Sequence, residues 1–134
     1  MEENELTAYE KEFVDTVEEI KDLFLKKNRG YNGENPFLNF IVGARLLYNA
    51  GDLVGCFEAL KAYVAKHISN IYTHTLDADG IEESCKDIAT YMIIATIMKR
   101  QLTMQQTMRK VNQKLPEKAV PELTEEQEVV DDAD

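Results

Sequence analysis

The sequence lacks tryptophan and has only two cysteines in 134 residues. Two cysteines are too few for the disulfide framework of a small secreted domain. Cys56 and Cys85 both fall on apolar helical faces, so we expect reduced core residues, with a single disulfide as the alternative. The longest uncharged stretch of the C-terminal half, Ile88 to Met98, is about half as long as a membrane-spanning helix. The N-terminal MEENEL is acidic where a secretion signal is basic. A cytoplasmic protein with no membrane contact is therefore expected.

Positive charge is also scarce, with 15 basic against 25 acidic residues and a net charge of −10. Proteins that bind a nucleic-acid backbone carry basic patches, so direct nucleic-acid binding is not expected. An acidic protein can still bind a nucleotide or another phosphorylated small molecule. It would do so through a few local cations, or through a metal ion held by carboxylates.

Apolar spacing predicts an all-α protein with four helices and no strand. The predicted helices cover about Leu6 to Lys27, Pro36 to Asn49, Leu53 to Tyr72 and Ile81 to Val111. Asn35-Pro36 is typical of a helix N-cap and first turn. At the second junction, Gly51 suits a C-cap and Asp52 an N-cap. Residues 28–35 and 73–80 are predicted loops.

The fourth predicted helix carries no charge from Ile88 to Met98, so we expect it to be the buried centre of a compact four-helix bundle-like domain. Beyond Arg100 it is polar and is expected to project or to pair with another subunit. Residues 113–134 hold eight acidic residues, two basic residues and two prolines, without a helical stripe. The predicted organisation is an all-α domain over residues 1–112 and a disordered acidic tail over 113–134.

Glu83 and Asp87 are four residues apart and so share a helix face. Two carboxylates at this spacing can bind one divalent cation, and Mg²⁺ prefers such oxygen ligands. The alternative is that both acids simply favour the positive end of the helix dipole. Glu18, Glu19 and Asp22 repeat the spacing in the first predicted helix, where a solvated acidic face is the stronger interpretation.

Two further groups of residues are candidates for phosphate contacts. His67 follows Lys66 on the apolar stripe of the third predicted helix, with Asn70 one turn later. Either this face contacts a phosphate or a metal, or His67 is a core residue with satisfied hydrogen bonds. The segment 26–33 combines three cations with glycines, amides and Tyr31, but it is not a P-loop. No Ser-His-Asp, Cys-His, HExxH or CxxC arrangement is recognisable, so neither covalent catalysis nor a zinc site is expected.

Four stretches in order carry a family resemblance. They are Lys27 to Tyr31, Asn35 to Phe40, Lys66 to Ile71 and Glu82 to Tyr91. Together they resemble the nucleotide-modification-associated domain of bacteriophage proteins, which is related to the MazG-like all-α nucleoside triphosphate pyrophosphohydrolases. The resemblance covers about residues 10–100. Gly30 departs from it, because an aspartate is common at this position.

The resemblance implies a Mg²⁺-dependent site. Glu83 and Asp87 match the second acidic motif and would be the metal ligands, with His67 as a further catalytic residue. The first acidic motif belongs on the third helix, where this sequence has Lys66 and His67 instead of carboxylates. Acids of the first helix are candidates for the missing ligands. The nucleotide contacts implied are Lys27, Asn28, Tyr31, Asn39, Lys66 and Asn70.

Two functional hypotheses follow. The first is a phage nucleotide pyrophosphohydrolase that uses Mg²⁺ at Glu83 and Asp87. The second is a protein without turnover, which sequesters a nucleotide or binds a host protein to counter host defence. Under either hypothesis a homo-oligomer, a dimer or tetramer, is expected. Leu102, Met104 and Met108 offer apolar surface beyond the core, and MazG-like relatives assemble in this way.

Overall fold

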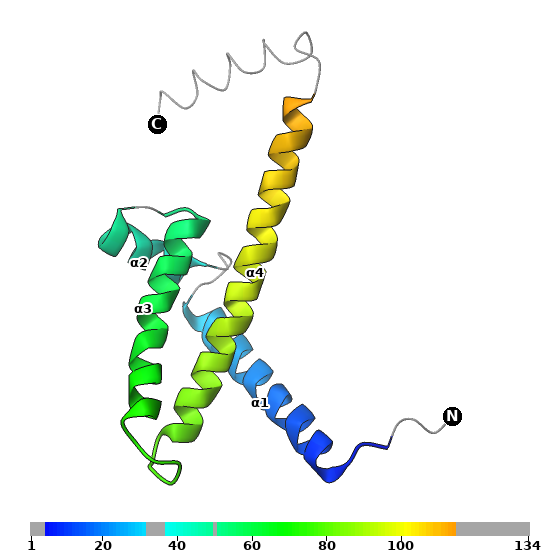
Figure 1. Cartoon of the computed structure of the whole chain (residues 1–134), viewed down its shortest axis with the longest axis vertical. Helices are drawn as coiled ribbons and strands as arrows, with labels where there is room; N and C mark the ends of the chain where they lie inside the picture. Colours follow the sequence, from blue (N-terminus) through cyan, green and yellow to red (C-terminus); the bar gives the residue numbers. More distant parts are fainter. Residues whose placement is uncertain (1–4, 32–36, 50, 115–134) are drawn as a thin grey trace. The chain divides into compact units, whose positions relative to one another are not determined.

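The computed structural model describes residues 5–31, 37–49 and 51–114, which form four α-helices and no strand (Figure 1). The helices are α1 (Ala8–Tyr31), α2 (Leu38–Tyr48), α3 (Leu53–Tyr72) and α4 (Ile81–Gln113). The predicted all-α class is confirmed, and the bounds predicted for α3 are those observed. The predicted acidic tail lies outside the described residues from position 115 onward.

The N-terminus of α1 is fixed by a capping box. Thr7 and Glu10 each donate a backbone N–H to the other's side chain, at 2.9 and 3.1 Å. At its other end α1 continues to Tyr31, so the prediction of a loop from residue 28 was wrong. The basic residues of the last turns suit the negative end of the helix dipole. Gly30 lowers the stability of the helix by only about 1 kcal/mol, and the interaction of these basic residues with the helix dipole can offset that loss.

The ends of α2 also differ from the prediction. The helix begins after Phe37, which serves as N-cap without a side-chain hydrogen bond, rather than after Asn35. Asn35 and Pro36 themselves are outside the described residues. Asn49, not Gly51, is the C-cap, because it adopts the left-handed conformation at φ 56° that asparagine tolerates. The predicted N-cap of α3 is confirmed, since Asp52 Oδ1 accepts the Gly55 N–H at 2.9 Å.

The chain divides into two units, residues 1–98 and 99–134, so α4 contributes to both. In the first unit α2, α3 and α4 share one core. Its buried members are Phe37, Phe40, Cys56, Leu60, Val64 and Met98. Ile88, Tyr91, Ile94 and Ala95 of α4 pack against this core from one side of the helix. The three- and four-residue steps between Ile88, Tyr91, Ala95 and Met98 place those four residues on one helical face.

Burial of α4 is therefore one-sided. Met92, Ile93 and Ile97 are exposed, although burial of every face was expected. On α1, Phe13 and Val17 are exposed as well, although the apolar spacing from which this helix was predicted would bury them on one side. Both cysteines are free, so the disulfide alternative is excluded. Cys56 is buried as predicted, but Cys85 is exposed and is not a core residue.

No single helix within the described ranges has the length and hydropathy to cross a membrane. By length and composition alone, α2 and α3 taken together as a bent pair could cross one. The apolar residues of α3 include Cys56, Leu60 and Val64, which form the core of the first unit.

Candidate functional site

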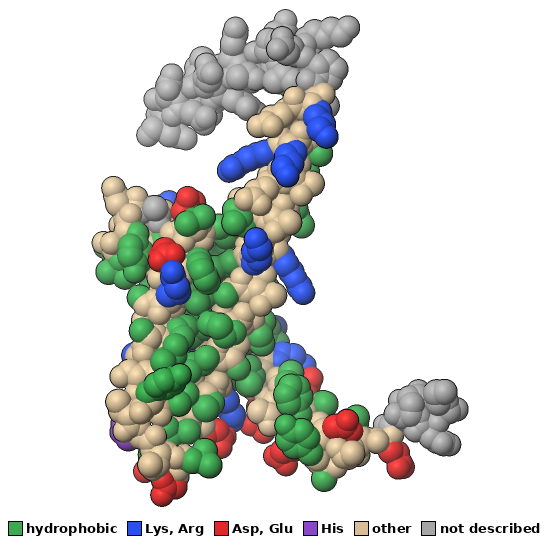
Figure 2. Space-filling model, viewed as in Figure 1, with side chains coloured by type: hydrophobic (Ala, Val, Ile, Leu, Met, Phe, Trp, Pro, Cys, Tyr) green, Lys and Arg blue, Asp and Glu red, His purple; other side chains and the backbone are tan. Residues whose placement is uncertain are grey.

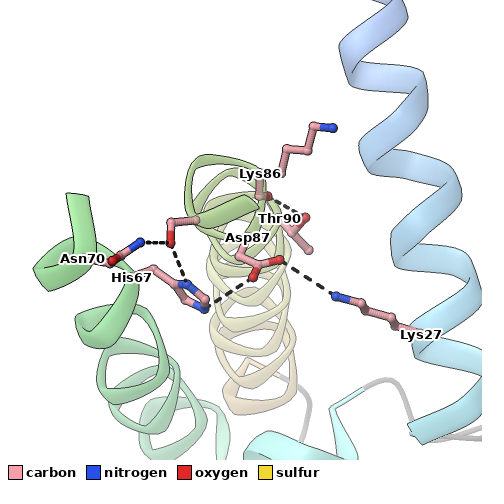
Figure 3. A network of polar contacts seen from close by, with 7 residues as sticks. Lys27, His67, Asn70, Lys86, Asp87 and Thr90 are labelled. Carbon is pink, nitrogen blue, oxygen red and sulfur yellow. Dashed lines mark hydrogen bonds and ion pairs between the residues drawn. The ribbon is translucent and has the colours of Figure 1, made fainter. Parts of the chain in front are cut away.

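Asp87, on the second turn of α4, lies between a lysine of α1 and a histidine of α3 (Figure 3). Lys27 Nζ is 4.0 Å from Asp87 Oδ1, and His67 Nε2 is 3.5 Å from Asp87 Oδ2. The side chains of Asp87 and His67 are 24% and 15% exposed, so solvent reaches both only in part. Three helices therefore place one carboxylate between two nitrogen donors.

The other side of the His67 ring faces Ser84. Its Nδ1 lies 3.5 Å from Ser84 Oγ, and Asn70 Nδ2 donates a hydrogen bond to the same oxygen at 2.9 Å. Since Asn70 is a donor here, the Ser84 hydroxyl proton can be donated to Nδ1. His67 would then carry its proton on Nε2, facing Asp87. The Asp87 carboxylate on the Nε2 side favours this tautomer, and the contacts at both nitrogens hold the ring in place.

Ser84 and Asp87 lie on opposite sides of the His67 ring, an arrangement that was not predicted from the sequence. Ser84 is only 6% exposed, and its oxygen already accepts the Asn70 hydrogen bond. A nucleophile needs an open approach to substrate, which this serine lacks. We therefore assign Ser84 a positioning role. Its signal in the sequence is spacing, because Ser84 and Asp87 are three apart on α4, as His67 and Asn70 are on α3.

Lys86 connects α4 to α1 at a second point. Its Nζ lies 2.9 Å from Glu19 Oε1 and 2.8 Å from Glu82 Oε2. Hydrogen bonds to Glu82 and Glu19 raise the pKa of Lys86, and its ammonium group lowers the pKa of Glu82. The carboxylate of Glu19, a candidate for the missing metal ligand, is thus engaged with a lysine. Glu18 pairs likewise with Lys21, at 2.8 Å.

The described residues include no group of three or more histidine, cysteine, aspartate or glutamate side chains placed to hold one metal ion. Glu83 is exposed one turn before Asp87. Their oxygens remain a chemically suitable pair for Mg²⁺, which takes carboxylates together with phosphate oxygens and water.

The structure brings together four of the predicted site residues, namely Lys27, His67, Asn70 and Asp87. Others lie outside this network. Lys66 is exposed on α3, and Asn39 is exposed on α2, where its backbone carbonyl accepts the Tyr63 hydroxyl at 3.2 Å. Asn28 is half-buried in α1 and has contacts of its own. Tyr31 ends α1, with its side chain outside the described part.

Tyr91 is a neighbour of the site to which the sequence assigned no role. Its ring centroid lies 6.1 Å from that of His67 and 6.2 Å from that of Phe40. Burial, followed by the charges of Asp87 and Tyr63, raises the pKa of Tyr91. An aromatic wall thus adjoins the polar network, and it connects the network to the core.

Comparison with protein-family models, curated proteins and solved structures finds no match for this chain. The resemblance to the phage domain therefore stays a prediction.

Proposed function

We propose that the protein is a phage-type nucleotide-handling protein that binds a nucleotide, or another phosphorylated small molecule, at the Asp87 network. The observation that carries this proposal is the convergence of Lys27 and His67 on Asp87 from two other helices. A phosphate group accepts hydrogen bonds from the same donors as a carboxylate. Lys27 is about half exposed, so an incoming phosphate can reach its ammonium group.

The surroundings of the network support the same ligand class. Lys66 adds an exposed positive charge next to His67. The rings of His67 and Tyr91 lie 6.1 Å apart beside the network, and a base that stacks on an aromatic ring does so with little dependence on which base it is. A ligand with a negative and an aromatic part fits this combination better than a simple anion does.

Binding without turnover is the form of the proposal that the arrangement favours. Lys66 and His67 occupy the helix positions where the resemblance would require carboxylates, and Glu19 pairs with Lys86. Mg²⁺-dependent pyrophosphohydrolysis is the second candidate, supported by the oxygens of Glu83 and Asp87. Mg²⁺, when bound, would neutralise phosphate charge, while Lys27 and His67 would hold the phosphates in place.

Calorimetry against a panel of nucleoside mono-, di- and triphosphates and cyclic nucleotides tests binding. Lys27→Met should weaken the affinity for the bound nucleotide at least tenfold. Lys61→Met is the matched control, because Lys61 is equally exposed, at 54% against 53%, and also pairs with a carboxylate. Absence of binding across the panel, or equal affinities of the two variants, would contradict the proposal.

Product analysis with and without Mg²⁺ separates the two candidates. Binding in the presence of a chelator, with no phosphate or pyrophosphate released, supports sequestration. Mg²⁺-dependent release that is lost in Asp87→Asn supports the hydrolase instead.

A further inference from the structure

The first half of α1, with the residues just before it, is both apolar and acidic on its exposed surface. Tyr9, Phe13 and Val17 follow each other at four-residue steps and are 80%, 64% and 44% exposed. Residues 5–19, which we call the acidic face, hold six acidic residues and one lysine, a net charge of −5. A stripe of large apolar side chains in water is unusual for a helix that has its final partner.

The second unit has the opposite character. Residues 99–114, here the basic face, hold five basic residues and no acidic one, a net charge of +5. Met104, Met108 and Val111 share one side of this part of α4 and are all exposed. Exposed apolar side chains occur on both helices, acids lie on α1, and lysine and arginine lie on the distal part of α4 (Figure 2).

We propose that the acidic face of one copy of the chain docks on the basic face of a second copy. The two faces match in apolar character and are equal and opposite in charge. Pairing of like faces would bring −5 against −5, or +5 against +5, and is disfavoured by repulsion. Reciprocal exchange closes a two-fold dimer with two identical contacts.

Two charge-reversal variants test this pairing. One carries Glu12→Arg and Asp15→Arg on the acidic face, and the other carries Arg109→Glu and Lys110→Glu on the basic face. All four positions are exposed, and none takes part in the Asp87 network. Asp77→Arg with Asp79→Arg, in the loop before α4, changes the net charge by the same +4 as the acidic-face variant and leaves both faces intact.

Sedimentation velocity over a concentration series is the measurement. The wild-type chain and the loop control should dimerise, with an affinity that falls as salt increases. Each face variant alone should dimerise at least tenfold more weakly, because the reversal leaves a charge of only −1 on the acidic face, or +1 on the basic face, against the unchanged opposite face. An equimolar mixture of the two should dimerise more strongly than either variant alone, since one contact of a mixed dimer then joins an unchanged face of −5 to an unchanged face of +5.

Three results would overturn the proposal. The first is a wild-type chain that stays monomeric at every concentration. The second is a mixture that dimerises no more strongly than either variant alone. The third is a loss of dimerisation in the basic-face variant but not in the acidic-face variant, because the acidic residues from position 115 onward, and not the acidic face, would then be the partner of the basic face. Circular dichroism of each variant checks that helix content is retained.

Discussion

Replacing Ser84 by alanine removes the oxygen that joins Asn70 to His67. Asn70 Nδ2 would lose its 2.9 Å hydrogen bond, and His67 Nδ1 would lose a long contact of 3.5 Å. Leaving a buried polar group unpaired costs about 1–3 kcal/mol. Asn70 and His67 are partly exposed, so the low end of that range applies, and alanine returns about 0.5 kcal/mol through its helix propensity. We expect Ser84→Ala to lower the free energy of unfolding by about 0.5 kcal/mol, which is about 1 kcal/mol more than the same substitution at an exposed helix position.

Urea unfolding followed by circular dichroism measures this change. Ser69→Ala is the matched control, because Ser69 lies exposed in α3, where the same substitution should be neutral or slightly stabilising. The ¹⁵N chemical shifts of the His67 ring report the tautomer and should move toward an averaged pattern in Ser84→Ala. If Ser84→Ala is as stable as its control and the ring shifts stay unchanged, the positioning role of Ser84 is refuted.

Three further predictions concern the core and the pH response. Leu60→Ala should cost about 2–5 kcal/mol in urea unfolding, because Leu60 is fully buried between the helices and the cavity would be only partly refilled. Gly43→Ala should loosen the contact of α2 with α3, since the added methyl group would collide with the Tyr63 hydroxyl; loss of stability that Tyr63→Phe partly restores is the expected result. Tyr91 has its pKa raised in the folded state, so its contribution to stability is complete below the ordinary tyrosine value and is lost as pH rises from there through the raised folded value. Stability should therefore fall above about pH 10, and fall less in Tyr91→Phe, as followed by unfolding at a series of pH values.

The interiors of the helices could be predicted from the sequence, because the three- to four-residue apolar period is a direct consequence of helix geometry. The N-cap at Asp52 was also predictable, since its side chain acts on a backbone group three residues away. The C-terminal end of α1 could not be predicted from the sequence. Asn28, Arg29 and Gly30 favour a turn locally, and the helix continues where Lys27 can contact Asp87 on a distant helix.

The residues of the site that share a face within one helix could also be predicted from their spacing in the sequence. The short spacings of His67 with Asn70, and of Glu83 with Asp87, indicate which side chains share a face within one helix. They do not indicate which faces meet. The contact of Ser84 with His67 depends on how α3 and α4 pack, and 17 residues separate the two in the chain. The exposure of Phe13 and Met92 was missed for a related reason, since an apolar stripe indicates that a partner is needed and not that the same chain supplies it.

The Asp87 network and the acidic face are connected through α1. The helix reaches α4 through Lys27 and Glu19, and exposed ion pairs of this kind contribute about 1 kcal/mol or less each. A phosphate that binds Lys27 would weaken the ion pair between Lys27 and Asp87. It would thereby weaken the packing of α1, which carries the acidic face, against α4. Coupling between two binding events is reciprocal. If nucleotide binding alters dimerisation by some factor, dimerisation must alter nucleotide affinity by the same factor. The two charge-reversal variants therefore provide a second measurement, because each of them alone should bind nucleotide with an affinity different from that of their mixture.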